Sequence, residues 1–188
     1  TVLRSFDRML SDAALQALRE AGVTIVTHAE PARLAPSATG RGHDLTLGTG
    51  QVLAGQDCVL WAIGREPLSG CIAPEVGVLR DAQGFVPTDE FQETNVPGVF
   101  AIGDVTGRAA LTPVAIAAGR RLADRLWGGM AGRRLDYDNV ATVVFGHPAI
   151  GTIGLTEAEA RARHGEAVRV FTSDFVPLYN SMTTTKPK

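Results

Sequence analysis

The stretch VFAIGDV at residues 99–105, followed by LTPVAIAAGRR at residues 111–121, decides the expected fold. The first part is typical of a buried strand that stops at a Gly-Asp pair. The second predicts a helix, with Thr112 as N-cap and Pro113 in the first helical position. A ligand site is expected here, because Asp104 can accept hydrogen bonds from hydroxyl groups and a helix start offers free N–H groups and about half a positive charge. In the alternative interpretation, Asp104 caps a turn and Thr112 merely caps a helix.

Composition indicates an ordinary soluble globular protein. The chain has 188 residues, of which 45% are apolar and 20% are charged, and its formal net charge is −2. This balance favours neither nucleic acid nor an anionic membrane surface as a partner. No apolar run approaches the ~20 residues of a spanning helix, and no signal peptide is seen, so we expect a cytoplasmic location. The first and last residues read as internal sequence, and we therefore expect a piece of a longer protein.

The cysteines and histidines show no pattern of a redox pair or a metal site. Cys58 lies in the apolar run CVLWAIG and is expected to be a small buried residue, whereas Cys71 is expected in a loop. A disulfide between the two has no support in the sequence but stays open. The four histidines are scattered, without a nucleophile or carboxylate partner in view.

Local patterns predict an alternation of helices and strands, which defines an α/β fold. A helix is expected from Ser11 with Gly22 just past its end, and another from Thr156, where Glu159 completes a capping box. Antiparallel pairing is expected in a hairpin of residues 43–47 and 51–55. The remaining expected strands are residues 23–28, 57–64 (buried on both faces), 84–89, 99–105, 142–145, 150–154 and 168–175.

The amino-acid sequences of these segments resemble those of the flavin disulfide reductases, and within that family those of the glutathione reductase branch. The motifs that carry the resemblance run in order through the chain: LRSFD, AIGREP, FAIGDV, LTPVAIAAGR and TVVFGHPAIGTIGLTE. The resemblance implies that Asp104 binds the ribitol of FAD and that Thr112 lies at the flavin ring. A helix dipole aimed at a ring that gains negative charge would stabilise that charge.

The resemblance also implies a set of NADPH contacts. Arg4 matches one of two arginines that hold the 2′-phosphate and so select NADPH over NADH, a task that suits the two parallel donors of a guanidinium. The companion arginine is expected just before Thr1. Gly64, at an expected strand end, matches a dinucleotide contact where the backbone lets a ligand approach closely. Ala110 and Val143 match residues that line the nicotinamide pocket. The alternatives are an exposed arginine paired with Asp7, a simple glycine turn and a core valine.

Arg120 discriminates most between substrates. It lies eight residues after Thr112, and in the alternative interpretation it pairs with Asp124 on the same helix. In glutathione reductases the matching arginine binds a glycine carboxylate of glutathione disulfide, whereas trypanothione reductases have a small residue there. Because an arginine–carboxylate contact favours only the charged substrate, Arg120 favours glutathione.

The resemblance divides the chain into three predicted parts. Residues 1–66 would end an NADPH-binding domain, residues 67–134 would form the second part of an FAD-binding domain, and residues 135–188 would begin an α+β dimerisation domain. These are parts of two Rossmann-like domains plus an interface unit, from a homodimeric enzyme. The chain has no catalytic cysteine pair, no glycine-rich phosphate loop and no His-Glu pair, so we expect it to hold half-sites. Another disulfide reductase (trypanothione, thioredoxin or lipoamide type) and a non-catalytic nucleotide-binding module stay open as alternatives.

Overall fold

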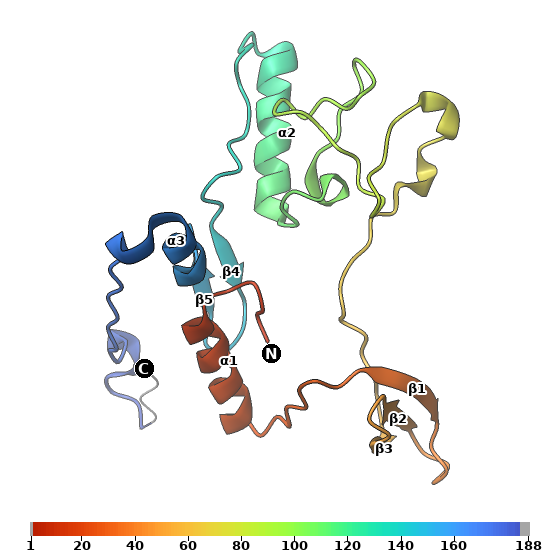
Figure 1. The fold of residues 1–188 in the computed structure, drawn as a ribbon, viewed down its shortest axis with the longest axis vertical. Coiled ribbons are helices and arrows are strands. Elements are labelled where there is room, and N and C mark those ends of the chain that lie inside the picture. The colour runs from red at the N-terminus through yellow and green to blue at the C-terminus, as the bar shows by residue number, and fades with distance from the viewer. Residues whose placement is uncertain (1, 185–188) are drawn as a thin grey trace.

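The computed structural model describes residues 2–184. Residues 181–188, whose sequence SMTTTKPK is typical of a loop, lie partly outside the described residues. In chain order its helices and strands are α1 (Arg8–Glu20), β1 (Pro31–Pro36), β2 (His43–Leu47), β3 (Val52–Gln56), α2 (Thr112–Trp127), β4 (Thr142–Val144), β5 (Ile150–Thr152) and α3 (Glu157–His164). Short 3-10 turns occur between them, among them η3 (Gly103–Thr106). Figure 1 shows the β1–β3 sheet at the bottom right, well apart from helix α2 at the top.

The predicted hairpin is confirmed. β2 pairs with β3 in an antiparallel register, and β1, which the sequence pattern did not reveal, adds a third strand on the other side of β2. The pairing is reinforced by Asp44, whose Oδ1 accepts a hydrogen bond from the Gly55 N–H at 2.8 Å. This bond, with help from the Ser37 hydroxyl, holds the pKa of Asp44 below its ordinary value.

Helix α1 begins earlier than the sequence predicts but ends where expected. It begins at Arg8 rather than Ser11. Gly22 has a φ of +82°, in the left-handed region that favours glycine. The Val23 N–H donates to the Leu18 carbonyl at 2.9 Å, so the end of α1 is a Schellman motif.

The two predicted strands β4 and β5 and helix α3 are also confirmed. β4 and β5 are antiparallel, with Val143 opposite Gly151. At the start of α3 the capping box has both of its hydrogen bonds: the Thr156 Oγ1 accepts from the Glu159 N–H, and the Glu159 side chain accepts from the Thr156 N–H at 2.8 Å. The bond from the Thr156 N–H, with one from the Thr156 hydroxyl to the same carboxylate at 2.9 Å, holds the pKa of Glu159 below its ordinary value.

Five of the predicted strands are wrong. The structure has no strand at residues 23–28, 57–64, 84–89, 99–105 or 168–175. Within 99–105, Phe100 forms only an isolated bridge with Glu93. A strand needs a ladder of hydrogen bonds to a neighbouring strand. Segments 84–89 and 99–105 share the bond from the Val86 N–H to the Val105 carbonyl at 2.9 Å, but they form no such ladder among the described residues. The predicted burial of segment 57–64 on both faces of a sheet is also wrong, because Leu60 and Ile63 are 85% and 86% exposed.

Both cysteines are free and exposed. The prediction that Cys58 is buried is wrong because its segment is not a sheet strand. Cys71, predicted in a loop, ends a short 3-10 turn at Ser69–Cys71.

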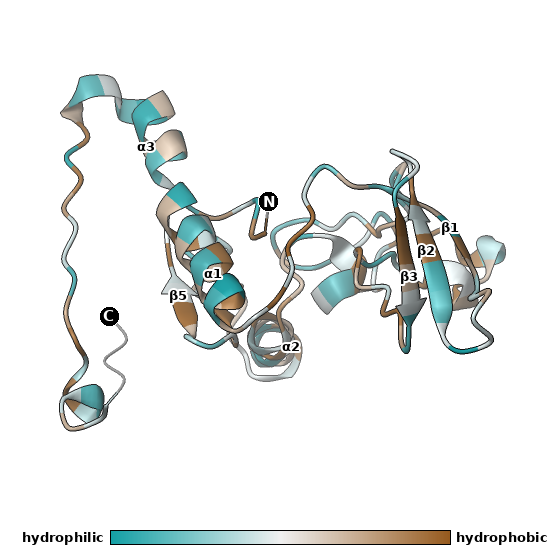
Figure 2. Ribbon diagram, turned by 90° about the horizontal axis from the view of Figure 1, so that it is seen from below, coloured by the Kyte–Doolittle hydropathy of each residue, from teal (hydrophilic) through white to brown (hydrophobic). Residues whose placement is uncertain are grey.

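Little of the apolar surface is covered. A folded monomer of this mass exposes about 8,600 Å², whereas this chain exposes 14315 Å². Among the described residues, the buried apolar side chains are Leu47, Val86 and Ala118. After α3 the chain continues as an extended stretch (Figure 2), in which Phe171 and Phe175 are exposed. The order that exists is therefore mostly local, in turns, caps and a few close packing contacts.

Candidate functional site

Asp104 lies in a tight turn directly before helix α2. The turn is η3, in which the Thr106 Oγ1 donates to the Gly103 carbonyl at 2.8 Å and the Gly107 N–H donates to the Asp104 carbonyl at 3.1 Å. These bonds fix the backbone and leave the Asp104 carboxylate exposed. Its Oδ2 lies 3.8 Å from Nη1 of Arg65, in an ion pair whose two side chains are mostly in solvent. The carboxylate can therefore accept hydrogen bonds from a ligand.

Small residues press this turn against α2. A Cβ added to Gly103 would lie 3.2 Å from the Cβ of Ala115, and one added to Gly119 would lie 3.1 Å from Cδ1 of Ile102. Both distances are tighter than ordinary van der Waals contact. Ala118, on the same helix, is fully buried. The spacing of small residues in α2 thus sets how closely Asp104 approaches the helix.

The start of α2 differs by one residue from the prediction. The N-cap is Leu111, with φ −132° and ψ 124°, and not Thr112, which is the first helical residue; Pro113 follows it as the second. Proline is well tolerated in the first turn of a helix because it has no N–H to leave unpaired. No side chain caps this end. The positive end of the helix dipole is therefore open to a ligand beside Thr112.

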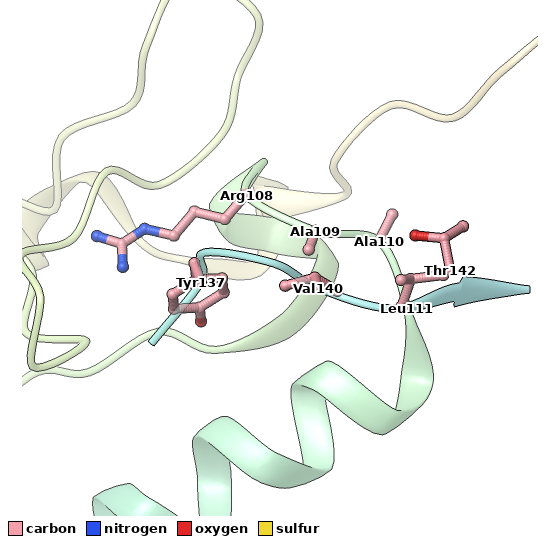
Figure 3. A pocket seen from close by; sticks show the side chains of 7 residues that line it. All are labelled: Arg108, Ala109, Ala110, Leu111, Tyr137, Val140 and Thr142. Atoms are coloured by element: carbon pink, nitrogen blue, oxygen red, sulfur yellow. The ribbon is translucent and has the colours of Figure 1, made fainter. Parts of the chain in front are cut away.

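A cavity of about 620 Å³ lies beside this helix start (Figure 3). It is lined by Arg108, Ala109, Ala110, Leu111, Tyr137, Val140 and Thr142. Arg108 is held in place from two sides. Its Cζ lies 5.0 Å from the centre of the Tyr137 ring, and its Nη2 donates to the carbonyls of Thr88 and Asp89, the latter at 2.6 Å. The cavity wall thus combines small apolar side chains with one fixed cation.

The two residues predicted to line a nicotinamide pocket lie near each other but are not equivalent. Ala110 lines the cavity. On β4, the residue that lines the cavity is Thr142, while its neighbour Val143 is half exposed. Successive side chains of a strand point to opposite faces, which separates Val143 from Thr142. Their predicted role stays a prediction.

Arg4 and Gly64 lie on segments away from this cavity. Arg4 is exposed on a turn before α1 and lines a second cavity, of about 1090 Å³, between that turn and α3. The alternative pairing of Arg4 with Asp7 is not seen. Gly64 has a φ of +147° and nothing within 4 Å of the position of a Cβ, so its backbone is open to a ligand. It precedes Arg65, the partner of Asp104.

Arg120 is exposed on α2, two turns after Thr112. The alternative pairing with Asp124 is not formed. Asp124 is engaged instead by Arg133, whose Nε lies 3.6 Å from its Oδ2. In the part of the chain that the structure describes, the Arg120 guanidinium has no ion-pair partner, and it is available for an anionic group.

Three residues of the site could not be predicted from the motifs alone. Arg65 directly follows Gly64 in the motif AIGREP, and its charge is a signal for an ion pair with a carboxylate such as Asp104. Arg108 and its aromatic partner Tyr137 are 29 residues apart, and no local pattern relates such positions. Among residues 2–184 no cluster of His, Cys, Asp or Glu has the arrangement of a metal site.

Together, an exposed carboxylate, an uncapped helix start and an apolar-walled cavity suit a ligand with hydroxyl groups and an electron-rich ring. The chain belongs to the pyridine nucleotide-disulphide oxidoreductase family: the family's model matches residues 1–119, and the model of its dimerisation domain matches residues 140–188. The α/β class predicted from the sequence is thereby confirmed.

Glutathione reductase from Schizosaccharomyces pombe is 41% identical to this chain over 191 residues, which cover 99% of this chain and 40% of the relative. The chain thus spans less than half the length of that relative.

Solved structures of the same kind are similar in fold. The Cu(II) complex of the HOCl-induced flavoprotein disulfide reductase RclA from Escherichia coli is 29% identical, with a TM-score of 0.77 over 86% of this chain and 36% of that one. LpdA from Mycobacterium tuberculosis is 26% identical, with a TM-score of 0.74 over 84% of this chain and 34% of that one.

Among the helices of residues 2–184, none is both long enough and apolar enough to cross a membrane.

Proposed function

We propose that this chain is part of an NADPH-dependent, FAD-containing enzyme that reduces glutathione disulfide. The observation that carries the proposal is the free Arg120 guanidinium on α2, because a glutathione carboxylate is the anion that the family resemblance assigns to it. The similarity to a glutathione reductase over nearly the whole chain supports it.

The donor set fits FAD. The Asp104 carboxylate is exposed and would accept hydrogen bonds from the ribitol hydroxyls. The uncapped start of α2 at Thr112 would face the edge of the flavin ring that becomes negative on reduction. FAD, when bound, supplies the two-electron chemistry between a nicotinamide and a disulfide.

The NADPH contacts are distributed over several segments. Arg4 would hold the 2′-phosphate through charge-assisted hydrogen bonds, and Gly64 would let the dinucleotide approach the backbone. Ala110 and Val143 would line the nicotinamide pocket. As in the predicted domain scheme, these residues belong to parts 1–66, 67–134 and 135–188 of the chain.

A homodimer in the cytoplasm is the proposed setting. The match to a dimerisation domain over residues 140–188 supports the dimer. Glutathione disulfide is an internal thiol-buffer substrate, which is consistent with a cytoplasmic location.

The test is to replace Arg120 by Ala in the full-length gene product and to measure turnover of glutathione disulfide with NADPH. Loss of a charge-assisted contact worth about 1.5–3 kcal/mol should raise KM for glutathione disulfide by about 10- to 150-fold. Arg19→Ala is the matched control, because Arg19 is equally exposed on a helix but lies outside the site. If Arg120→Ala leaves KM unchanged, or if the wild-type protein prefers trypanothione disulfide, the assignment of substrate is wrong.

A further inference from the structure

The turn that carries Arg4 is built from three hydrogen bonds. The Phe6 N–H donates to the Leu3 carbonyl at 3.0 Å, and Leu3 has a φ of +51°. The buried Ser11 hydroxyl reaches back from α1 and donates to the Val2 carbonyl at 2.6 Å. These two bonds close the turn on itself. They do not fix how it lies against the rest of the molecule.

The third bond comes from Asp7 and fixes the turn to a distant helix. Asp7 is the N-cap residue of α1, but its side chain makes no capping bond to that helix. Its Oδ1 instead accepts the N–H of Glu157 at 2.7 Å, across 150 residues of sequence. Glu157 is the first residue of α3.

This bond extends the cap of α3. The capping box of Thr156 and Glu159 satisfies the N–H groups of those two residues, and Asp7 supplies an outside acceptor for the amide of Glu157. A carboxylate at this position also interacts favourably with the positive end of the α3 dipole. Asp7 therefore holds the turn and α3 together by a bond that both elements need.

The 1090 Å³ cavity between the turn and α3 has one unpaired cation on its wall. Arg8 pairs with Asp12 at 3.5 Å, and Arg161 pairs with Glu157 at 2.8 Å. Arg4 has no ion-pair partner among the described residues. The turn determines where Arg4 lies relative to the cavity. The Asp7 bond determines how the turn lies against α3.

We propose that Asp7 is a positioning residue for the 2′-phosphate of NADPH, and that it makes the selection of NADPH over NADH depend on the first turn of α3. The inference rests on the proposed function, because Arg4 is the group that touches the phosphate. Asp7 itself does not touch the dinucleotide. It holds the Arg4 turn in the orientation that the phosphate needs by its bond to α3. That helix lies in the match to the dimerisation domain.

The experiment measures binding of 2′,5′-ADP and of 5′-AMP to the flavin-loaded, full-length gene product by calorimetry, together with kcat/KM for NADPH and NADH. Asp7→Ala should weaken 2′,5′-ADP binding by about 2- to 30-fold, the range for coupling carried through a contact. Binding of 5′-AMP, which lacks the 2′-phosphate, should not change. Asp7→Asn should restore most of the affinity, because its side-chain oxygen still accepts the Glu157 N–H.

A second variant removes the same hydrogen bond from the other side. Glu157→Pro deletes the N–H, and proline is well tolerated in the first position of a helix. Thr156, the preceding residue, already has the extended backbone that a following proline requires. Glu157→Ala is the control, since it loses the ion pair with Arg161 but keeps the N–H. The effects of Asp7→Ala and Glu157→Pro should not add when combined, because both remove one bond.

The outcomes separate the two proposals. Arg4→Ala should reduce the preference for 2′,5′-ADP over 5′-AMP; if the preference is unchanged, the NADPH role of Arg4 fails, and the inference fails with it. If Arg4→Ala acts as expected but Glu157→Pro and Asp7→Ala bind 2′,5′-ADP like the wild type, only the positioning role of Asp7 is overturned. If Asp7→Ala does not fold, Glu157→Pro and Glu157→Ala decide the question between them.

Discussion

Gly107 closes the η3 turn that presents Asp104, and its replacement by alanine tests how tightly this turn is held. Gly107 has a φ of +69°, and an added Cβ would lie 2.9 Å from Cγ of Phe85 and 3.2 Å from the two neighbouring ring carbons. The left-handed backbone costs alanine about 1–2 kcal/mol. The collision with the ring adds about 1–3 kcal/mol, because the half-buried Phe85 has to move.

Gly77 provides the matched control. It also follows a 3-10 turn as its C-cap, at φ 73° and ψ 13°, against φ 69° and ψ 0° for Gly107. Nothing lies within 4 Å of its Cβ position. Gly77→Ala should therefore cost only the backbone term, about 1–2 kcal/mol.

The assay is urea unfolding of the full-length gene product, followed by tryptophan fluorescence, for the wild type and the two variants. We expect Gly107→Ala to lower the free energy of unfolding by about 2–5 kcal/mol and to weaken flavin binding, because the shifted turn displaces Asp104. Gly77→Ala should leave flavin binding unchanged. Equal destabilisation by the two substitutions would refute the claim that the Phe85 ring packs against Gly107.

Arg125 and Glu159 offer two further predictions. Arg125 donates to the Phe91 carbonyl at 2.9 Å and lies 5.3 Å from the ring centres of Phe91 and Phe100, so Arg125→Lys should lower the free energy of unfolding by about 1–3 kcal/mol in the same urea assay. A lysine that unfolds like the wild type contradicts this stacking. The pKa of Glu159 is lowered in the folded state, so its contribution to the cap of α3 is complete above the ordinary pKa and is lost as the pH falls through the folded value. An NMR titration of the Thr156 amide should show this loss in the wild type and not in Glu159→Gln.

Elements with local chemistry could be predicted from the sequence. The capping box of Thr156 and Glu159 and the left-handed Gly22 depend on residues within a few positions of each other, and both are confirmed. The hairpin at residues 43–47 and 51–55 depends on one short turn, and it is confirmed as well.

Elements that need a distant partner could not be predicted in the same way. The apolar runs at 57–64 and 168–175 have strand composition, but a strand exists only where another strand accepts its hydrogen bonds. The site shows the same division. The exposed Asp104 and the open start of α2 follow from local sequence, apart from the shift of the N-cap from Thr112 to Leu111. The contact of Asp7 with α3 joins residues 150 positions apart, and no local sequence pattern predicts it.

The most direct test of the account is NADPH oxidation by the full-length gene product in the presence of glutathione disulfide, with the flavin spectrum recorded on the same sample. We expect a yellow protein that oxidises NADPH only when the disulfide is present and uses NADH poorly. A colourless protein, or one that leaves NADPH unchanged when glutathione disulfide is added, would contradict it.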